Sequence, residues 1–215
     1  LVIRIVNMSG WIMWVVNGIF ENIGMVQDGL KTIAQPLAVI DRENAPRLSV
    51  PHGEVRFEQV DFHYGKSSGI IGGLNLVIKP GEKIGLIGPS GAGKSTLVNL
   101  LLRLYDLQGG RILIDGQNIA DVAQESLRER IGMITQDTSL LHRSIRDNLL
   151  YGKPDATDAE LWEAVHKARA DEFIPLLSDA EGRTGFDAHV GERGVKLSGG
   201  QRQRIAIARV LLKDA

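Results

Sequence analysis

Residues 83–103 contain the pattern that most limits how this chain folds: an apolar run, a glycine-rich loop and a second apolar run. The loop reads Gly-Pro-Ser-Gly-Ala-Gly-Lys-Ser from Gly88 to Ser95 and fits G-x-x-x-x-G-K-[ST]. The run at 83–87 predicts a short strand, and residues 96–103 predict a helix. A strand, a glycine loop and a helix in this order predict a phosphate-binding loop within an α/β domain, which we expect from Glu54 onward.

The chemistry of this loop predicts a nucleoside triphosphate and Mg²⁺ as ligands. Glycines let backbone N–H groups converge on phosphate oxygens, and the following helix N-terminus adds partial positive charge. Lys94 supplies a full charge to the phosphates and is the candidate catalytic cation, while the Ser95 hydroxyl is a hard oxygen ligand suited to Mg²⁺. The candidate binding residues are Gly88, Pro89, Ser90, Gly91, Ala92, Gly93, Lys94, Ser95 and Thr96.

A second glycine cluster, Leu197-Ser-Gly-Gly-Gln201, precedes a run with helical periodicity at 202–212. Ser198 is a suitable N-cap, and Gly199 and Gly200 expose backbone N–H groups at the positive end of the expected helix. The segment therefore predicts a second anion site. Ser-Gly-Gly alone would favour the simpler interpretation, a capped helix that has a flexible entry.

The two clusters together carry a resemblance. Leu197–Gln201 followed by Arg202-Gln-Arg204, downstream of a phosphate loop, resembles the signature of ATP-binding cassette (ABC) ATPases. Further segments resemble family features in the same order, namely the aromatic loop (62–64), the hairpin (110–116), the strand ending in the Q-loop glutamine (131–136) and two exporter-type segments (144–152 and 190–194). The resemblance spans about residues 50–215. It implies an α/β P-loop NTPase fold, the ABC-type nucleotide-binding domain, with a helical insert at about 137–197.

The resemblance also implies residue roles, with ATP and Mg²⁺ as cofactors. Tyr64 would stack on adenine. Gln136, the second candidate catalytic residue beside Lys94, would sense the γ-phosphate and join Ser95 at the metal. In this family two cassettes face each other head to tail, so Ser198, Gly199, Gly200 and Gln201 would contact ATP bound to a second half-transporter, identical or related. Glu192 would contact the intracellular loops of the membrane domain.

The first twenty residues are mostly apolar and carry a single charge, Arg4. The residues alone leave two interpretations open, a membrane helix and an amphipathic helix packed on a soluble core. With the resemblance, we expect residues 1–36 to be the cytoplasmic end of a transmembrane helix. Pro36 is expected to end or kink it. Residues 37–53 are then a linker, and residues 54–215 are the nucleotide-binding domain.

The family's Walker B strand, its catalytic Glu and its switch His have no counterpart in the sequence. We therefore expect the chain to be a piece of a longer protein, truncated at both ends, with the domain incomplete at its C-terminus. Without a carboxylate to orient water, this piece is expected to hydrolyse ATP poorly. A missing central strand is expected to leave an exposed apolar face.

Composition excludes some classes of function. Lys and Arg number 25 against 26 Asp and Glu, and this balance argues against a nucleic-acid partner. The absence of Cys excludes thiol chemistry and Cys-ligated metals. The leading interpretation is a membrane exporter half, in a bacterial inner membrane with its ATPase domain in the cytoplasm, moving a small molecule, lipid or peptide. Two alternatives stay open: a soluble ABC ATPase acting on nucleic acid or translation, and a truncated regulator that binds ATP without hydrolysing it.

Two weaker patterns lie outside the motifs. Arg128, within Ser126-Leu-Arg-Glu-Arg130, is expected to be a solvated charge on a helix. The polar run at 155–160 is expected to be a capped helix start.

Overall fold

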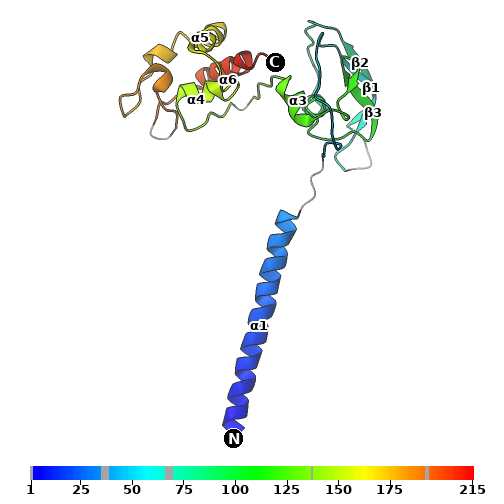
Figure 1. The fold of residues 1–215 in the computed structure, drawn as a ribbon, viewed down its shortest axis with the longest axis vertical. Coiled ribbons are helices and arrows are strands. Elements are labelled where there is room, and N and C mark those ends of the chain that lie inside the picture. The colour runs from blue at the N-terminus through cyan, green and yellow to red at the C-terminus, as the bar shows by residue number, and fades with distance from the viewer. Residues whose placement is uncertain (1, 35–38, 66–69, 137, 192–193) are drawn as a thin grey trace. The chain divides into compact units, whose positions relative to one another are not determined.

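The computed structural model of the chain describes residues 2–34, 39–65, 70–136, 138–191 and 194–215. By their internal contacts the residues divide into two units, one ending at Ile40 and the other comprising Asp41–Ala215. Figure 1 labels most of the helices and strands of both. Glu192 and Arg193 of the exporter-type segment lie outside the described residues.

The first unit is one long helix, α1 (Val2–Ile33). The helix predicted for this region is confirmed, and it ends before Pro36, which lies outside the described residues. Large apolar side chains of α1 are exposed, among them Trp11, Trp14 and Phe20. In the part of the chain that the structure describes, no helix combines the length and the apolar character that crossing a membrane requires. The assignment of residues 1–36 to the end of a transmembrane helix stays a prediction.

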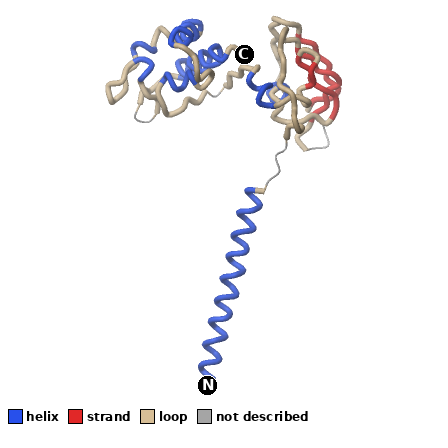
Figure 2. The backbone as a smooth tube through the Cα atoms, viewed as in Figure 1, coloured by secondary structure: helices blue, strands red, loops and turns tan. Residues whose placement is uncertain are grey.

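The second unit contains a four-stranded antiparallel sheet, drawn in red in Figure 2. Its strands are β1 (Val55–Phe62), β2 (Ile71–Ile78), β3 (Gly109–Ile114) and β4 (Gln117–Asn118), in the order β2-β1-β3-β4. Strands β3 and β4 form a hairpin, which confirms the one predicted at 110–116. Gly110 is required beside a bulge of β1, because a Cβ there would lie 2.1 Å from the Gln59 carbonyl oxygen.

Two helices belong to the sheet region, α2 (Lys94–Leu101) and α3 (Gln124–Glu129). The helix predicted after the glycine loop is thus confirmed. Both helices contribute to one apolar core with the strands, in which Phe57, Val60, Leu100, Ile112 and Leu127 are buried. This core fixes α2, and with it the end of the glycine loop, against β1 and β3.

The strands predicted at 83–87 and 131–136 are absent, and both predictions are wrong for this structure. Ile84, Leu86 and Ile87 are exposed, Ile87 almost completely, at 99%. Met133 and Ile134 are exposed as well. An apolar run forms a buried strand only where neighbouring strands accept and donate its backbone hydrogen bonds. Among the described residues neither run joins a ladder, and the expected exposed apolar face is present at these side chains.

The helical part that follows has its own core. It comprises α4 (Ile145–Leu150), α5 (Asp158–Lys167), two 3₁₀ turns, η1 (Ile174–Leu176) and η2 (Gly185–Asp187), and α6 (Gly199–Lys213). Their shared core includes the buried side chains Ile145, Leu149, Leu161, Ile174 and Ile205. The expected helical insert is present, and a Thr157–Glu160 capping box confirms the helix start predicted at 155–160.

Residues 41–53, expected to be a linker, contain no helix or strand but pack on the sheet region. Leu48 is buried in the sheet core. The Asp115 carboxylate accepts hydrogen bonds from the backbone N–H groups of His52, Gly53 and Glu54 at 2.9, 3.0 and 2.8 Å. The bonds from Gly53 and His52 lower the pKa of the Asp115 carboxyl below its ordinary value.

Candidate functional site

The glycine loop enters α2 through two residues in the left-handed region. Gly91 and Gly93 both have φ +85°, a conformation that residues with a side chain rarely adopt. A Cβ on Gly93 would also lie 3.0 Å from the Ile70 side chain. Gly93 is the N-cap of α2 and offers no side-chain cap. The first backbone N–H groups of α2 therefore lack the side-chain acceptor that a Ser or Asp cap would provide, as suits an anion site.

Lys94 lies over the loop that precedes it. Its ammonium group donates hydrogen bonds to the carbonyl oxygens of Gly88 and Pro89, both at 2.8 Å. These are neutral acceptors, and a phosphate oxygen would form stronger, charge-assisted bonds with the same ammonium group. The loop thus keeps a cation beside the N-terminus of α2.

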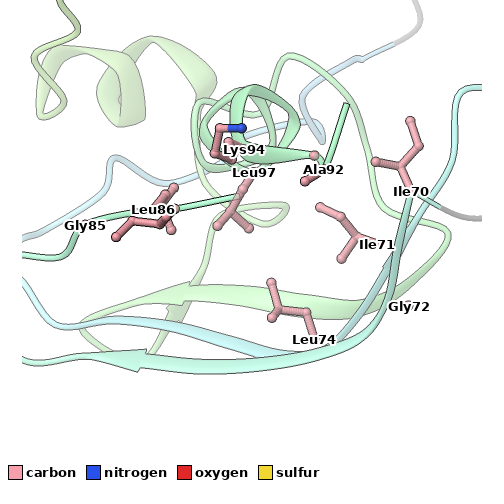
Figure 3. A pocket seen from close by; sticks show the side chains of 11 residues that line it. Ile70, Ile71, Gly72, Leu74, Gly85, Leu86, Ala92, Lys94 and Leu97 are labelled. Atoms are coloured by element: carbon pink, nitrogen blue, oxygen red, sulfur yellow. The ribbon is translucent and has the colours of Figure 1, made fainter. Parts of the chain in front are cut away.

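A cavity of about 430 Å³ borders the loop, as Figure 3 shows. Ala92, Gly93 and Lys94 line it together with apolar side chains of β2 and of the exposed run at 83–87. Leu74 and Leu97 are among the apolar side chains on its wall. The structure brings three of the predicted loop residues to one concave surface.

A second cavity, of about 410 Å³, brings Ser95 and Gln136 together. Asn99, Met133 and Thr135 also line it. A Ser hydroxyl oxygen and a Gln amide oxygen are ligands that suit Mg²⁺. This ion commonly takes only one or two protein ligands beside phosphate and water. The two residues predicted for the metal therefore fit it. The described residues contain no group of three or more His, Cys, Asp and Glu that could hold a metal ion.

Tyr64 belongs to a cluster of three aromatic rings. It packs edge-on against Phe62, with ring centres 4.8 Å apart, and against Tyr105 at 5.0 Å. Its hydroxyl donates a hydrogen bond to the Thr96 side chain at 3.3 Å. Two predicted site residues, Tyr64 and Thr96, are thus in contact. Tyr105 was not predicted, because an aromatic residue just after a helix belongs to no motif.

The second glycine cluster forms the N-terminus of α6, and the predicted cap is confirmed. The Ser198 hydroxyl accepts a bond from the Gln201 backbone N–H at 3.2 Å, and the Gln201 side chain accepts one from the Ser198 N–H at 2.8 Å. Such a reciprocal pair fixes the first turn of a helix. Ser198, Gly199, Gly200 and Gln201 line neither of the two cavities around α2. Their binding role stays a prediction.

Sequence reasoning missed the residues that hold α6 in place. The Arg209 guanidinium donates to the backbone oxygen of Asn148 at 2.7 Å and to its side-chain oxygen at 3.0 Å. Asn148, on α4, is completely buried. Burial lowers the pKa of Arg209. The contact between Asn148 and Arg209 can be recognised only once α4 and α6 are packed together.

The prediction for Arg128 is wrong. Its guanidinium donates to the backbone oxygens of Leu102 and Arg103 at 3.2 and 2.9 Å, just beyond the C-terminus of α2. The last carbonyl groups of a helix have no partner within it, and a cation there complements the helix dipole. Arg128 therefore binds the end of α2 and is not a solvated charge.

Comparison with known proteins identifies the class to which this fold and loop belong. The family model described as ABC transporter matches residues 71–215. The solved structure of a bacterial Atm1-family ABC exporter with ATP bound aligns with a TM-score of 0.81 and 42% identity, over 91% of this chain and 33% of that one.

Curated relatives indicate the same family. An uncharacterized ABC transporter ATP-binding protein of Haemophilus influenzae is 60% identical over 99% of this chain and 35% of its own length. The mitochondrial iron-sulfur clusters transporter atm1 of Aspergillus fumigatus is 48% identical over 75% of this chain and 22% of its own length. The chain thus spans about a third or less of these relatives.

The chain belongs to the ABC transporter family, and its second unit has the family's P-loop nucleotide-binding fold.

Proposed function

We propose that this chain binds ATP and Mg²⁺ at residues 88–96, and that the protein to which it belongs hydrolyses ATP to export a substrate across a membrane. The observation that carries the proposal is the entry to α2. There, two glycines with left-handed φ leave the helix N-terminus without a side-chain cap, and Lys94 lies beside it. Family membership and an exporter relative with ATP bound support the same function.

Each residue around α2 has a task in this proposal. Lys94 exchanges its bonds to the Gly88 and Pro89 carbonyls for charge-assisted bonds to phosphate oxygens. Ser95 and Gln136, on one cavity, hold Mg²⁺, which neutralises charge on the transferring phosphoryl group. Tyr64 offers its ring to adenine while Phe62 and Tyr105 hold it edge-on.

Hydrolysis requires a water molecule in line with the γ-phosphate and a group that orients it. Among the residues that the structure describes, no carboxylate side chain lines the cavity that contains Ser95 and Gln136. We infer that these residues alone hydrolyse ATP slowly. A general base commonly contributes about 10²–10⁴-fold to a rate.

The signature residues act on a second cassette. Ser198, Gly199, Gly200 and Gln201 stand at a helix N-terminus and line neither cavity around α2, which supports a role toward nucleotide held by another half-transporter. That partner is an identical or related chain. ATP joins the two through charge-assisted hydrogen bonds, and hydrolysis separates them.

The membrane part of the proposal rests on the relatives and on α1. The cargo is a small molecule, a lipid or a peptide, and nucleic acid is not a partner. The exposed apolar side chains of α1 support contact with a membrane or with other apolar helices. The whole protein lies in a bacterial inner membrane, and its nucleotide-binding unit lies on the cytoplasmic side.

Phosphate release by the intact gene product in phospholipid nanodiscs tests the proposal. We expect release that requires Mg²⁺ and ATP. Lys94→Ala and Ser198→Ala are each expected to lower the rate, Lys94→Ala through binding and Ser198→Ala through closure of the dimer. An equal mixture of the two variants tests the partner role, because one site of a mixed dimer keeps both groups. Absence of phosphate release from the unaltered protein would refute hydrolysis as its function.

A further inference from the structure

The C-terminus of α2 ends in an unusual way. The Arg103 N–H bonds to the Leu100 oxygen and the Leu104 N–H to the Asn99 oxygen, both at 3.0 Å. This pair of bonds is a Schellman motif, whose left-handed residue is usually Gly. Here it is Arg103, with φ +49°. A side chain at a left-handed position costs conformational energy, so the Arg103 side chain must make contacts that offset it.

The Arg103 guanidinium is buried, and two of its three partners are charged. The Arg103 side chain is 5% exposed, and its guanidinium bonds to Asp41 at 3.0 Å, to Asp106 at 3.2 Å and to the Val122 carbonyl at 3.2 Å. A buried guanidinium that loses its carboxylate partner is strongly destabilised. Breaking the bond between Arg103 and Asp41 is therefore costly, although Asp106 remains as a second carboxylate partner.

Asp41 joins this arginine to α3. Its carboxylate accepts bonds from the backbone N–H of Gln124 at 3.0 Å and from the Gln124 side chain at 2.9 Å. Burial opposes ionisation, but the bonds from Gln124 and the charge of Arg103 outweigh it and lower the pKa of Asp41. Arg128 completes the network by donating to the Gln124 side chain at 2.8 Å and to the carbonyl oxygens of Leu102 and Arg103, just beyond α2.

The position of Asp41 in the chain places the network directly after the connection from α1. Asp41 is the first residue of the second unit, and the chain reaches it from α1 through residues 34–40. At its other end, α2 begins with Lys94 and Ser95. Eight helical residues span about 12 Å. One short helix thus separates the attachment of the N-terminal connection from the phosphate loop.

Two neighbouring ion pairs of the same segment are weaker. Arg42 pairs with Asp121, and Arg47 with Glu129, but the two arginine side chains are 71% and 70% exposed. Exposed ion pairs contribute little, because water and salt screen them. Of the three charged contacts of residues 41–48, the one made by Asp41 is therefore the firmest, and it lies at the end of α2, whereas Leu48 is held in the sheet core.

We propose that Asp41 is a positioning residue that ties the connection from α1 to the phosphate-loop helix, so that nucleotide binding at Lys94 and Ser95 is transmitted to that connection through α2 and Arg103. The inference rests on the proposed function, since it requires nucleotide at the loop. It assigns Asp41 and Arg103 to coupling and not to contact with the nucleotide.

Hydrogen–deuterium exchange of the intact gene product in phospholipid nanodiscs tests the coupling. Exchange is measured at residues 39–48 and in α2, with and without Mg²⁺ and a non-hydrolysable ATP analogue. In the unaltered protein we expect the nucleotide to slow exchange at both places, by about fivefold at residues 39–48. The matched control is Glu43→Gln, which makes the same carboxylate-to-amide change at an exposed residue two positions away and is expected to behave as the unaltered protein.

Asp41→Asn is expected to abolish the slowing at residues 39–48. It should preserve the slowing in α2 and change nucleotide affinity by less than about twofold. Arg103→Lys keeps the charge but replaces the planar fork that binds three acceptors, and it is expected to show the same selective loss. Asp41→Glu keeps the carboxylate and should restore at least part of the effect.

Three outcomes overturn the inference. If Asp41→Asn and Arg103→Lys keep the slowing seen in Glu43→Gln, no coupling passes through this pair. If they lose the slowing in α2 and the affinity together, the role is structural. If the unaltered protein shows no nucleotide effect in α2, the proposed function itself fails, and the coupling fails with it.

Discussion

Asn148→Ala is the substitution that tests the packing of the signature helix most sharply. The Asn148 side-chain oxygen accepts bonds from the Leu141 N–H at 2.8 Å and from Arg209 at 3.0 Å. Its amide group donates to the carbonyl oxygens of Leu141 at 3.0 Å and Ser144 at 2.9 Å. The residue therefore joins three segments: the stretch before α4, α4 itself and α6.

The magnitude follows from these four bonds. At about 0.5–1.5 kcal/mol each, their loss lowers the free energy of unfolding by about 2–6 kcal/mol. Arg209 keeps its 2.7 Å bond to the backbone oxygen of residue 148, which does not depend on the side chain. We therefore expect a loss of about 3 kcal/mol, toward the lower end of that range.

Urea unfolding followed by the fluorescence of Trp162 measures the change. Trp162 lies on α5 against Phe186, with ring centres 4.7 Å apart, and so reports on the helical core. Trp11 and Trp14 are replaced by Phe in every sample to remove their signal. Glu163→Ala, which removes an exposed ion pair with Lys167 on α5, is the control and should change little. A loss below about 1 kcal/mol in Asn148→Ala would refute the reasoning.

Three further predictions use the same protein. Ser198→Ala removes the hydroxyl that caps α6 and should cost about 1 kcal/mol in the Trp162 assay; no change would contradict the capping role. Gly93→Ala places a Cβ at φ +85° and 3.0 Å from Ile70, and equilibrium dialysis should show weaker ATP binding than in Gly81→Ala, a loop glycine at φ +72° with open space around it. Asp115 has a pKa below its ordinary value in the folded protein, so its stabilising effect is complete above about pH 4 and is lost as pH falls through that lowered pKa. Urea midpoints from about pH 5 to about pH 2 should therefore show the stability difference between the unaltered protein and Asp115→Asn shrinking in acid; a constant difference would be inconsistent with this assignment.

The parts of the fold that the sequence predicts are those decided locally. Ser198 and Gln201 form the expected cap because a capping box needs only four consecutive residues. The helix after the glycine loop depends on short-range periodicity and is present. The hairpin at 110–116 follows from the family resemblance and is present as well. The pairing of Ser95 with Gln136 at one cavity followed from the family resemblance, not from spacing.

The failures all depend on partners far away in the sequence. The apolar run at 83–87 predicts a strand, and the family resemblance implies another at 131–136. A strand also needs neighbours, and the described residues provide none. Arg128 has a surface-like sequence context, and only the packing of α3 beside the end of α2 gives it carbonyl partners. Asp41 lies in a stretch of mixed charge that resembles a linker, and its partners Arg103 and Gln124 are 62 and 83 positions away.

The central claim is that the loop before α2 binds ATP, and equilibrium dialysis of ATP against the 215-residue chain tests it most directly. Lys94→Ala is the matched variant, because it removes the ammonium group and leaves the glycines unchanged. The account predicts saturable binding that weakens at least about tenfold in Lys94→Ala, as loss of a charge-assisted phosphate contact requires. Equal ATP binding by the unaltered chain and by Lys94→Ala, or no binding by either, would contradict it.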